Sequence, residues 1–165
     1  MGKVIGIGGL SRSGKSTLAL WLHKQLPGSV MLCHDDFPND EARIPRIKDR
    51  VDWEHPESIN WNLWHKAVSS QAPDCEYLIL EGLFQFRPEA LPLPPQYLFY
   101  LGIDEQLFLT ERKKETRWGP EPDWYIRHVW QSHFQYGLPQ PGQQVARFEP
   151  ISDKDYPQIL REITT

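Results

Sequence analysis

Long apolar runs are missing from the sequence, as are several other signals of a specialised protein class. No stretch of about 18 apolar residues occurs, which argues against a membrane-spanning helix. The opening residues lack the basic and apolar regions of an export signal, so we expect a cytoplasmic protein. The 165 residues carry 18 basic and 22 acidic side chains, and this net charge of −4 argues against a nucleic-acid-binding protein.

Cysteine is also scarce, since only Cys33 and Cys75 are present. Each lies beside a predicted strand, and we expect both to be small core residues. This pair does not indicate a disulfide framework and is typical of a reducing compartment such as the cytosol. The histidines predict no zinc site, because His128 and His133 are five positions apart and fall on different faces of a predicted helix.

The order of the predicted elements indicates an α/β fold. The length and the lack of repeats or linkers favour one domain over residues 1–165, and we expect a monomer. Short apolar or β-branched runs predict strands at 4–7, 29–33, 76–80, 96–103 and 144–148. Helical spacing and capping residues predict helices at 16–26, from Pro56 to about 68, from Asp104 to about 114, from Asp123 to Gly137, and at 155–163. Alternating strands and helices are typical of a parallel sheet covered on both faces.

Residues 9–16 match the pattern G-x-x-x-x-G-K-[ST] and stand between a predicted strand and a predicted helix, as the motif requires. Glycines let successive backbone N–H groups point at phosphate oxygens, and the helix N-terminus adds positive partial charge. Lys15 can reach the β- and γ-phosphates, and the Ser16 hydroxyl can bind Mg²⁺. The alternative is a turn that binds nothing, which both flanking elements disfavour. We predict a nucleotide-binding loop of Gly9, Leu10, Ser11, Arg12, Ser13, Gly14, Lys15, Ser16 and Thr17.

Two acidic groups follow predicted strands, at the sheet edge where ligands of parallel sheets bind. Asp35 and Asp36 follow the strand at 29–33, and Glu81 follows the strand at 76–80. We predict that Asp35 accepts a proton from the phosphoryl acceptor and that Asp36 orients or caps it, although ordinary turn residues would look the same. For Mg²⁺ we predict the ligands Ser16, Asp35 and Glu81, with a solvated strand-end carboxylate as the alternative for Glu81.

A basic segment and two tryptophans complete the candidate site. The segment at 112–117 ends a predicted helix, and we interpret residues from about 112 to 125 as a lid whose Arg112 and Arg117 close over the transferring phosphate. A solvated helix end is the alternative. Trp53 and Trp118 could stack on a flat base and Glu54 could bind ribose, whereas Trp21, Trp64 and Trp130 have the spacing of core residues.

Four blocks resemble the nicotinamide riboside kinases and their uridine kinase relatives. They are residues 6–19, the His-Asp-Asp-Phe block at 34–37, the block at 78–83 that contains Leu-Glu-Gly, and His-Val-Trp at 128–130. The blocks stand in the family's order and together span most of the chain. The first is shared by many NTPases, whereas the other three together are much more specific.

This resemblance implies a P-loop NTPase fold with a five-stranded parallel sheet, a mobile lid, and ATP- and Mg²⁺-dependent phosphorylation of a nucleoside 5′-hydroxyl. The substrate it implies is nicotinamide riboside, and the product nicotinamide mononucleotide serves NAD biosynthesis. The substrate loop then spans about 34–56, and Trp53 and Glu54 stand where the family carries tyrosine and aspartate. The substrate-binding residues implied are Asp35, Asp36, Phe37, Trp53, Glu54, Lys113 and Trp118.

Three alternatives remain at this point. The His-Pro-Glu-Ser block at 55–58 resembles uridine kinases and keeps uridine and cytidine as possible acceptors. A GTPase switch would require N-K-x-D and D-x-x-G motifs, and neither occurs in the sequence. A catalytically silent ATP-binding module is disfavoured by the combination of Lys15, Ser16, Asp35 and Glu81.

Overall fold

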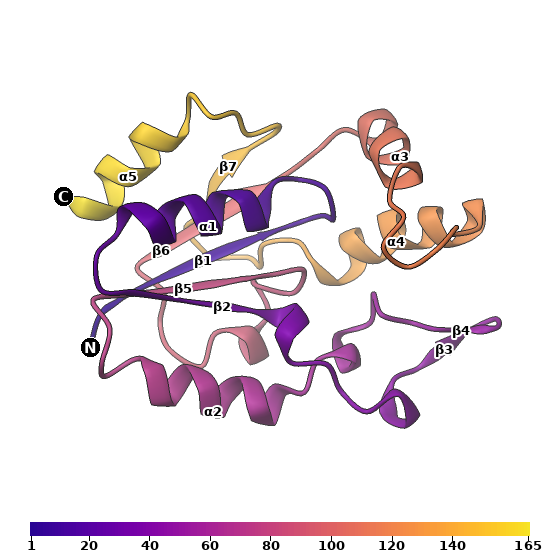
Figure 1. The fold of residues 1–165 in the computed structure, drawn as a ribbon, viewed down its shortest axis with the longest axis horizontal. Coiled ribbons are helices and arrows are strands. Elements are labelled where there is room, and N and C mark those ends of the chain that lie inside the picture. The colour runs from indigo at the N-terminus through magenta and orange to yellow at the C-terminus, as the bar shows by residue number, and fades with distance from the viewer.

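A five-stranded sheet forms the centre of the computed structural model, which describes residues 1–165 (Figure 1). Its strands are β1 (Lys3–Gly9), β2 (Ser29–Cys33), β5 (Tyr77–Gly82), β6 (Tyr97–Leu101) and β7 (Ala146–Phe148). They lie in the order β2-β5-β1-β6-β7, and every neighbouring pair is parallel, which confirms the predicted sheet. The chain passes from β5 over β1 to β6, so the strand order reverses beside β1, where open α/β sheets bind their ligands.

Helices cover both faces of the sheet, as the alternating pattern predicts. Helices α1 (Lys15–Gln25) and α5 (Tyr156–Thr164) lie over one face, and α2 (Trp61–Gln71) lies over the other (Figure 1). Helices α3 (Glu105–Lys113) and α4 (Asp123–Tyr136) pack on each other beyond the carboxyl ends of the strands. None of the helices is long and apolar enough to cross a membrane.

The core forms because the central strands alternate their buried side chains between the two faces. Ile5 and Ile7 of β1 pack with Leu18 and Leu22 of α1, whereas Val4 and Leu78 belong to the opposite layer with the fully buried Trp64 of α2. Burial of each such side chain contributes about 1.5–3 kcal/mol. A third apolar cluster joins Leu10 of the phosphate loop to Phe108 and Val129, and so fixes this loop against α3 and α4.

One predicted helix start and one predicted helix cap are wrong. The helix predicted from Pro56 begins instead at Trp61, because Pro56–Ser58 forms only a 3₁₀ turn and Ile59 is extended. Ile59 is buried and bridges Pro38, so a tertiary contact overrides the local helix signal. Asp123 is the first residue of α4 rather than its cap, and its charge still favours the positive end of the helix dipole.

The segment predicted as a plain loop, 34–56, contains short elements. It includes 3₁₀ turns at His34–Asp36 and Glu41–Arg43 and an antiparallel hairpin of β3 (Arg46–Ile47) and β4 (Arg50–Val51). Lys48 at the tip of the hairpin has a φ of 53°, in the left-handed region. This hairpin has only two residues in each strand, which is too short for any hydrophobic period to reveal it.

Candidate active site

The phosphate loop, residues 9–17, leaves β1 and enters α1. Gly14 takes the left-handed conformation at the N-cap, with a φ of 95°, and Arg12 takes it with a φ of 68°. A left-handed conformation costs a residue such as arginine about 1–2 kcal/mol, and such strain tends to gather at functional sites. The buried hydroxyl of Ser13 has no hydrogen-bond partner. The loop thus keeps polar groups free for a ligand.

Glu81 lies at the end of β5, beside the start of α1. Its Oε1 accepts hydrogen bonds from Ser16 Oγ and from Cys33 Sγ, each at 2.9 Å, whereas its buried Oε2 has no partner. Two of the three predicted Mg²⁺ ligands are therefore in direct contact. Cys33 is half-buried here rather than a core residue, which corrects the prediction made for it, while Cys75 is buried as expected.

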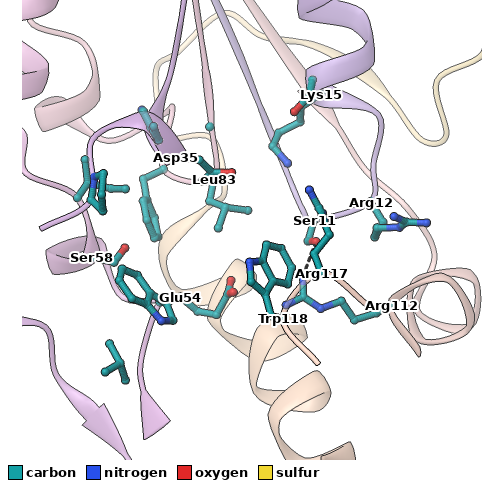
Figure 2. Close-up of a pocket in the computed structure, with 18 of the residues that line it drawn as sticks. Ser11, Arg12, Lys15, Asp35, Glu54, Ser58, Leu83, Arg112, Arg117 and Trp118 are labelled. Atoms are coloured by element: carbon teal, nitrogen blue, oxygen red, sulfur yellow. Dashed lines mark hydrogen bonds between the residues drawn. The ribbon is translucent and has the colours of Figure 1, made fainter. Parts of the chain in front are cut away.

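A cavity of about 640 Å³ opens beside the loop (Figure 2). Lys15 enters it from α1, Glu54 from the substrate loop, and Arg112 and Trp118 from the predicted lid. The predicted site residues that line this cavity are Ser11, Arg12, Lys15, Ser16, Asp35, Trp53, Glu54, Glu81, Arg112, Arg117 and Trp118. Segments far apart in sequence thus meet around one space, as the site prediction requires.

Asp35 and His34 lie at the end of β2, on the cavity wall. Partial burial raises the pKa of Asp35, and the charge of Glu81 raises it further, while Lys15 acts in the opposite direction. His34 is fully buried among aromatic rings, and burial lowers its pKa to about 3, with the charge of Lys15 adding to the effect. His34 is therefore neutral at physiological pH, and neither of its ring nitrogens has a partner.

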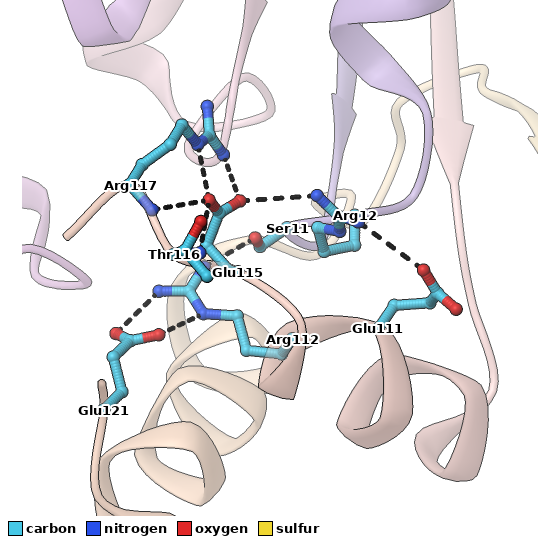
Figure 3. Close-up of polar contacts among 8 residues, drawn as sticks. All are labelled: Ser11, Arg12, Glu111, Arg112, Glu115, Thr116, Arg117 and Glu121. Atoms are coloured by element: carbon cyan, nitrogen blue, oxygen red, sulfur yellow. Dashed lines mark hydrogen bonds and ion pairs between the residues drawn. The ribbon is translucent and has the colours of Figure 1, made fainter. Parts of the chain in front are cut away.

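Arg112 is the most enclosed cation of the site. Its Nε and Nη2 donate to the two carboxylate oxygens of Glu121 at 2.8 and 3.0 Å, and its Nη1 donates to Ser11 Oγ at 2.7 Å. Glu54 lies near this pair, and burial raises its pKa to about 7, although the charge of Arg112 opposes that rise. Arg112 thus ties the predicted lid to the phosphate loop (Figure 3).

Arg117 takes part in a more exposed network, also visible in Figure 3. Its guanidinium donates to both carboxylate oxygens of Glu115 at 2.8 and 2.7 Å, and Arg12 of the phosphate loop lies 3.3 Å from the same carboxylate. The hydrogen bonds from Arg117 lower the pKa of Glu115 to about 2. Both Arg112 and Arg117 also lie over Trp118, with their guanidinium carbons 5.1 and 4.5 Å from its ring centre.

Three predicted substrate-binding residues do not line the cavity. Asp36 points to solvent, and Lys113 is exposed and makes only a 3.9 Å ion pair with Asp123. Phe37 packs edge-on against Trp64 and belongs to the core of the α2 layer. The sequence block at 34–37 therefore holds two cavity residues, His34 and Asp35, followed by an exposed residue and a packing residue.

A second, smaller groove of about 280 Å³ lies on the other side of the phosphate loop. Ser13, Gly14 and Thr17 line it together with Ile151 and Tyr156 near the C-terminus, and Arg12 borders both spaces. Gly9 and Leu10 line neither space, since Leu10 is buried in the cluster with α3 and α4. The loop thus separates a large cavity from a smaller groove.

Some cavity residues were not identified from the sequence. They include Arg50, Phe84, Glu121 and Tyr125, in addition to His34. Glu121 lies nine positions beyond its partner Arg112, across a turn without periodicity, so no local pattern joins the two. His128, by contrast, stands in a block that the sequence does single out, and it contacts Asp52, the neighbour of Trp53.

The strand order and the phosphate loop define the class as a kinase-type P-loop NTPase fold, and solved structures agree. A sugar kinase from Janibacter matches with a TM-score of 0.64 at 14% identity, and the match covers 98% of this chain and 92% of the sugar kinase chain. A possible uridine kinase from Bacillus stearothermophilus matches with a TM-score of 0.54 at 19% identity, covering 82% of each chain.

Sequence comparison finds that the chain is similar to the nicotinamide riboside kinases, which confirms the suspected resemblance. Human nicotinamide riboside kinase 1 is 29% identical over 154 residues, which cover 81% of this chain and 75% of that protein. Mouse nicotinamide riboside kinase 2 is 27% identical, with coverage of 97% and 94%. Uridine kinase from Saccharomyces cerevisiae is 35% identical over 72 residues, which cover 39% of this chain and 14% of that protein. No family model matches the chain.

Proposed function

We propose that this protein transfers the γ-phosphoryl group of ATP to the 5′-hydroxyl of nicotinamide riboside and releases nicotinamide mononucleotide for NAD biosynthesis. One observation carries the proposal: Lys15 of the phosphate loop and Asp35 line the same cavity, together with Trp53, Glu54 and Trp118. The relatives named as nicotinamide riboside kinases cover most of the chain and support the same reaction.

In the proposed reaction, the oxygen of the nucleoside 5′-hydroxyl attacks the γ-phosphorus, and Asp35 accepts the proton of that hydroxyl. The bond between that phosphorus and the β–γ bridging oxygen breaks, and ADP leaves. The raised pKa of Asp35 makes it a stronger base than an ordinary carboxylate. Lys15 and the backbone N–H groups of the phosphate loop stabilise negative charge on the phosphoryl oxygens.

A Mg²⁺ ion fits the residues at the ends of β5 and α1. Glu81 Oε2 is a buried carboxylate oxygen without a partner, and such an oxygen is costly to bury unless a cation or its bound water completes it. Ser16 and Glu81 would hold the ion, with Asp35 nearby. When bound, Mg²⁺ would neutralise charge on the β- and γ-phosphates.

The large cavity suits the nucleoside, and the groove at Thr17 and Ile151 suits the donor nucleotide. Two features favour a cationic pyridinium base over a neutral pyrimidine. Trp53 provides an electron-rich ring face, whereas Arg112 and Arg117 already lie over Trp118, and Asp35 and Glu54 provide carboxylates. Uridine or cytidine is the second candidate, supported by the yeast uridine kinase match over part of the chain.

A direct test combines the purified protein with ATP, Mg²⁺ and one acceptor at a time: nicotinamide riboside, uridine or cytidine. Mass spectrometry should detect nicotinamide mononucleotide at a rate far above that of an Asp35→Ala variant. A clear preference for uridine would replace the proposed acceptor with a pyrimidine nucleoside. Equal product from the variant and the natural protein would contradict the role of Asp35.

A further inference from the structure

The substrate loop has little regular structure of its own and is docked on α4. Along the loop, Lys48 lies over the ring of Trp124, Arg50 lies over Tyr125, and His55 meets Tyr136 edge-on. Between these contacts, Asp52 pairs with His128. The α4 residues involved are spaced so that they share one side of the helix, which therefore serves as a platform for the loop.

The contact between Asp52 and His128 is the most buried of this set. Asp52 is 7% exposed, and its Oδ1 accepts a hydrogen bond from His128 Nε2 at 2.8 Å. Because an ionised carboxylate only accepts hydrogen bonds, the proton must be on Nε2 of His128. Ser132 Oγ, one turn further along α4, lies 3.3 Å from the same nitrogen.

The same carboxylate oxygen holds the backbone of the predicted substrate-binding residues. Asp52 Oδ1 accepts the N–H of Glu54 at 3.2 Å, and the carbonyl of Asp52 accepts the N–H of His55, also at 3.2 Å. This turn places Glu54 as a buried carboxylate in the cavity and Trp53 on its wall. One side chain therefore connects α4 to the exact stretch of backbone from which both cavity residues project.

We propose that Asp52 and His128 are positioning residues that dock the substrate loop on α4 and hold Trp53 and Glu54 ready for the acceptor. The proposal rests on the proposed function for the nature of the acceptor. Neither residue lines the cavity, so both act through Trp53 and Glu54 and not by touching the nucleoside. Leu10 of the phosphate loop packs beside Val129 of α4, but neither Asp52 nor His128 lines the smaller groove, so binding of ATP should not depend on the pair.

The test compares His128→Ala, which removes the donor, with His128→Gln, whose side-chain amide can donate from a similar position. We expect His128→Ala to raise the KM for nicotinamide riboside about tenfold, because it removes the side-chain partner that ties the buried Asp52 carboxylate to α4 and leaves it only the N–H of Glu54. The KM for ATP and kcat should stay within about twofold, and His128→Gln should restore most of the acceptor KM. Arg127→Ala, an exposed change on the same helix, is the matched control.

A change in acceptor KM below about twofold, or a parallel rise in both KM values, would overturn the proposal. If the natural protein phosphorylates no nucleoside at all, the proposed function fails, and amide hydrogen exchange then decides about the docking. In that case His128→Ala should accelerate exchange within residues 45–55 and leave residues 9–17 unchanged. Unchanged or uniformly faster exchange would refute docking through this pair.

Discussion

The substrate loop and the predicted lid border the same cavity, yet the interactions that hold them differ. Shielded contacts hold the loop: Ile44 is 4% exposed, Glu54 is 8% exposed, and Asp52 reaches His128 in a largely buried pair. The outer part of the lid is held by charge: Arg117, 65% exposed, pairs with Glu115, whose own side chain is only 6% exposed, and Glu115 in turn pairs with Arg12, 34% exposed. Salt and phosphate compete with exposed ion pairs far more than with buried hydrogen bonds.

This difference matches the tasks proposed for the two regions. A nucleoside site gains affinity when its walls are formed in advance, because little ordering is then needed on binding. A lid must release and close again with each cycle, and ion pairs whose arginines are open to solvent allow this. Arg112 is the exception within the lid, because its pair with Glu121 is buried. It marks the point from which the outer lid could move.

The largest expected effect comes from Asp35, the proposed proton acceptor near the start of the substrate loop. Asp35→Asn should lower kcat about 10²- to 10⁴-fold, because the amide cannot accept the hydroxyl proton. Asp36→Asn is the matched control: it changes the neighbouring, solvent-facing carboxylate and should leave kcat within about threefold. Steady-state assays of nicotinamide mononucleotide formation measure both. A greater loss from Asp36→Asn would move the base to that residue.

Breaking the buried anchor of the lid should have the next largest effect. Arg112→Met leaves Glu121 and Glu54 buried without their cation, and we expect the free energy of unfolding to fall by about 3 kcal/mol. Lys113→Met, one position further along, removes an exposed charge and should change stability by less than about 0.5 kcal/mol. Urea unfolding measures both values.

The double variant Arg112→Met with Glu121→Met separates an unpaired charge from lost packing. If the cost of Arg112→Met comes from the carboxylate left behind, removing that carboxylate as well should recover part of the stability. No recovery would mean that the loss comes from the contact of Arg112 with Ser11 or from packing against Trp118.

The features that the sequence predicted correctly are those that depend on residues close together in the chain. The strands beside Ile5 and Leu78 are short apolar runs, the helix cap at Asp104 was predicted correctly, and the phosphate loop is a contiguous pattern. The phosphate-loop motif, the ends of the strands and a resemblance to known kinases together predicted 11 of the 22 residues that line the cavity. Each of these signals lies within about ten residues of sequence.

The parts that the sequence did not predict depend on contacts between distant segments. Glu121 closes on Arg112 across a proline- and glycine-containing turn, and Cys33 meets Glu81 only because β2 and β5 are neighbours. The start of α2 is displaced by the bridge between Pro38 and Ile59. Such pairings arise from tertiary packing, which overrides local propensity and leaves no period in the sequence.

The pH dependence of stability offers a test of the enclosed character of the substrate loop. Burial raises the pKa of Glu54 to about 7 from 4.5, so the folded protein binds a proton that the unfolded chain releases between these values. The unfolding free energy should therefore decline as pH rises from about 4.5 to about 7 and then level off. Glu54→Gln should lack this decline.

Urea unfolding of the natural protein and of Glu54→Gln, at half-unit steps from pH 5 to pH 8, measures the difference between the two curves. Other groups with shifted pKa values, such as His34, contribute equally to both proteins and cancel. Parallel curves over this range would mean that water reaches Glu54, and the contrast between an enclosed loop and an exposed lid would be lost.

The smallest expected effect concerns the outer lid. The carboxylate of Glu115 lies between Arg12 and Arg117, where it neutralises two cations that could otherwise pair with phosphate oxygens. Glu115→Gln removes this competing charge, so the KM for ATP should fall roughly two- to fivefold at low salt, and the difference should shrink as salt is added. Glu111→Gln is the control, since its 3.5 Å contact with Arg12 is longer and leaves Arg117 untouched. An increase in the KM for ATP would mean instead that Glu115 holds Arg117 in the orientation that binding requires.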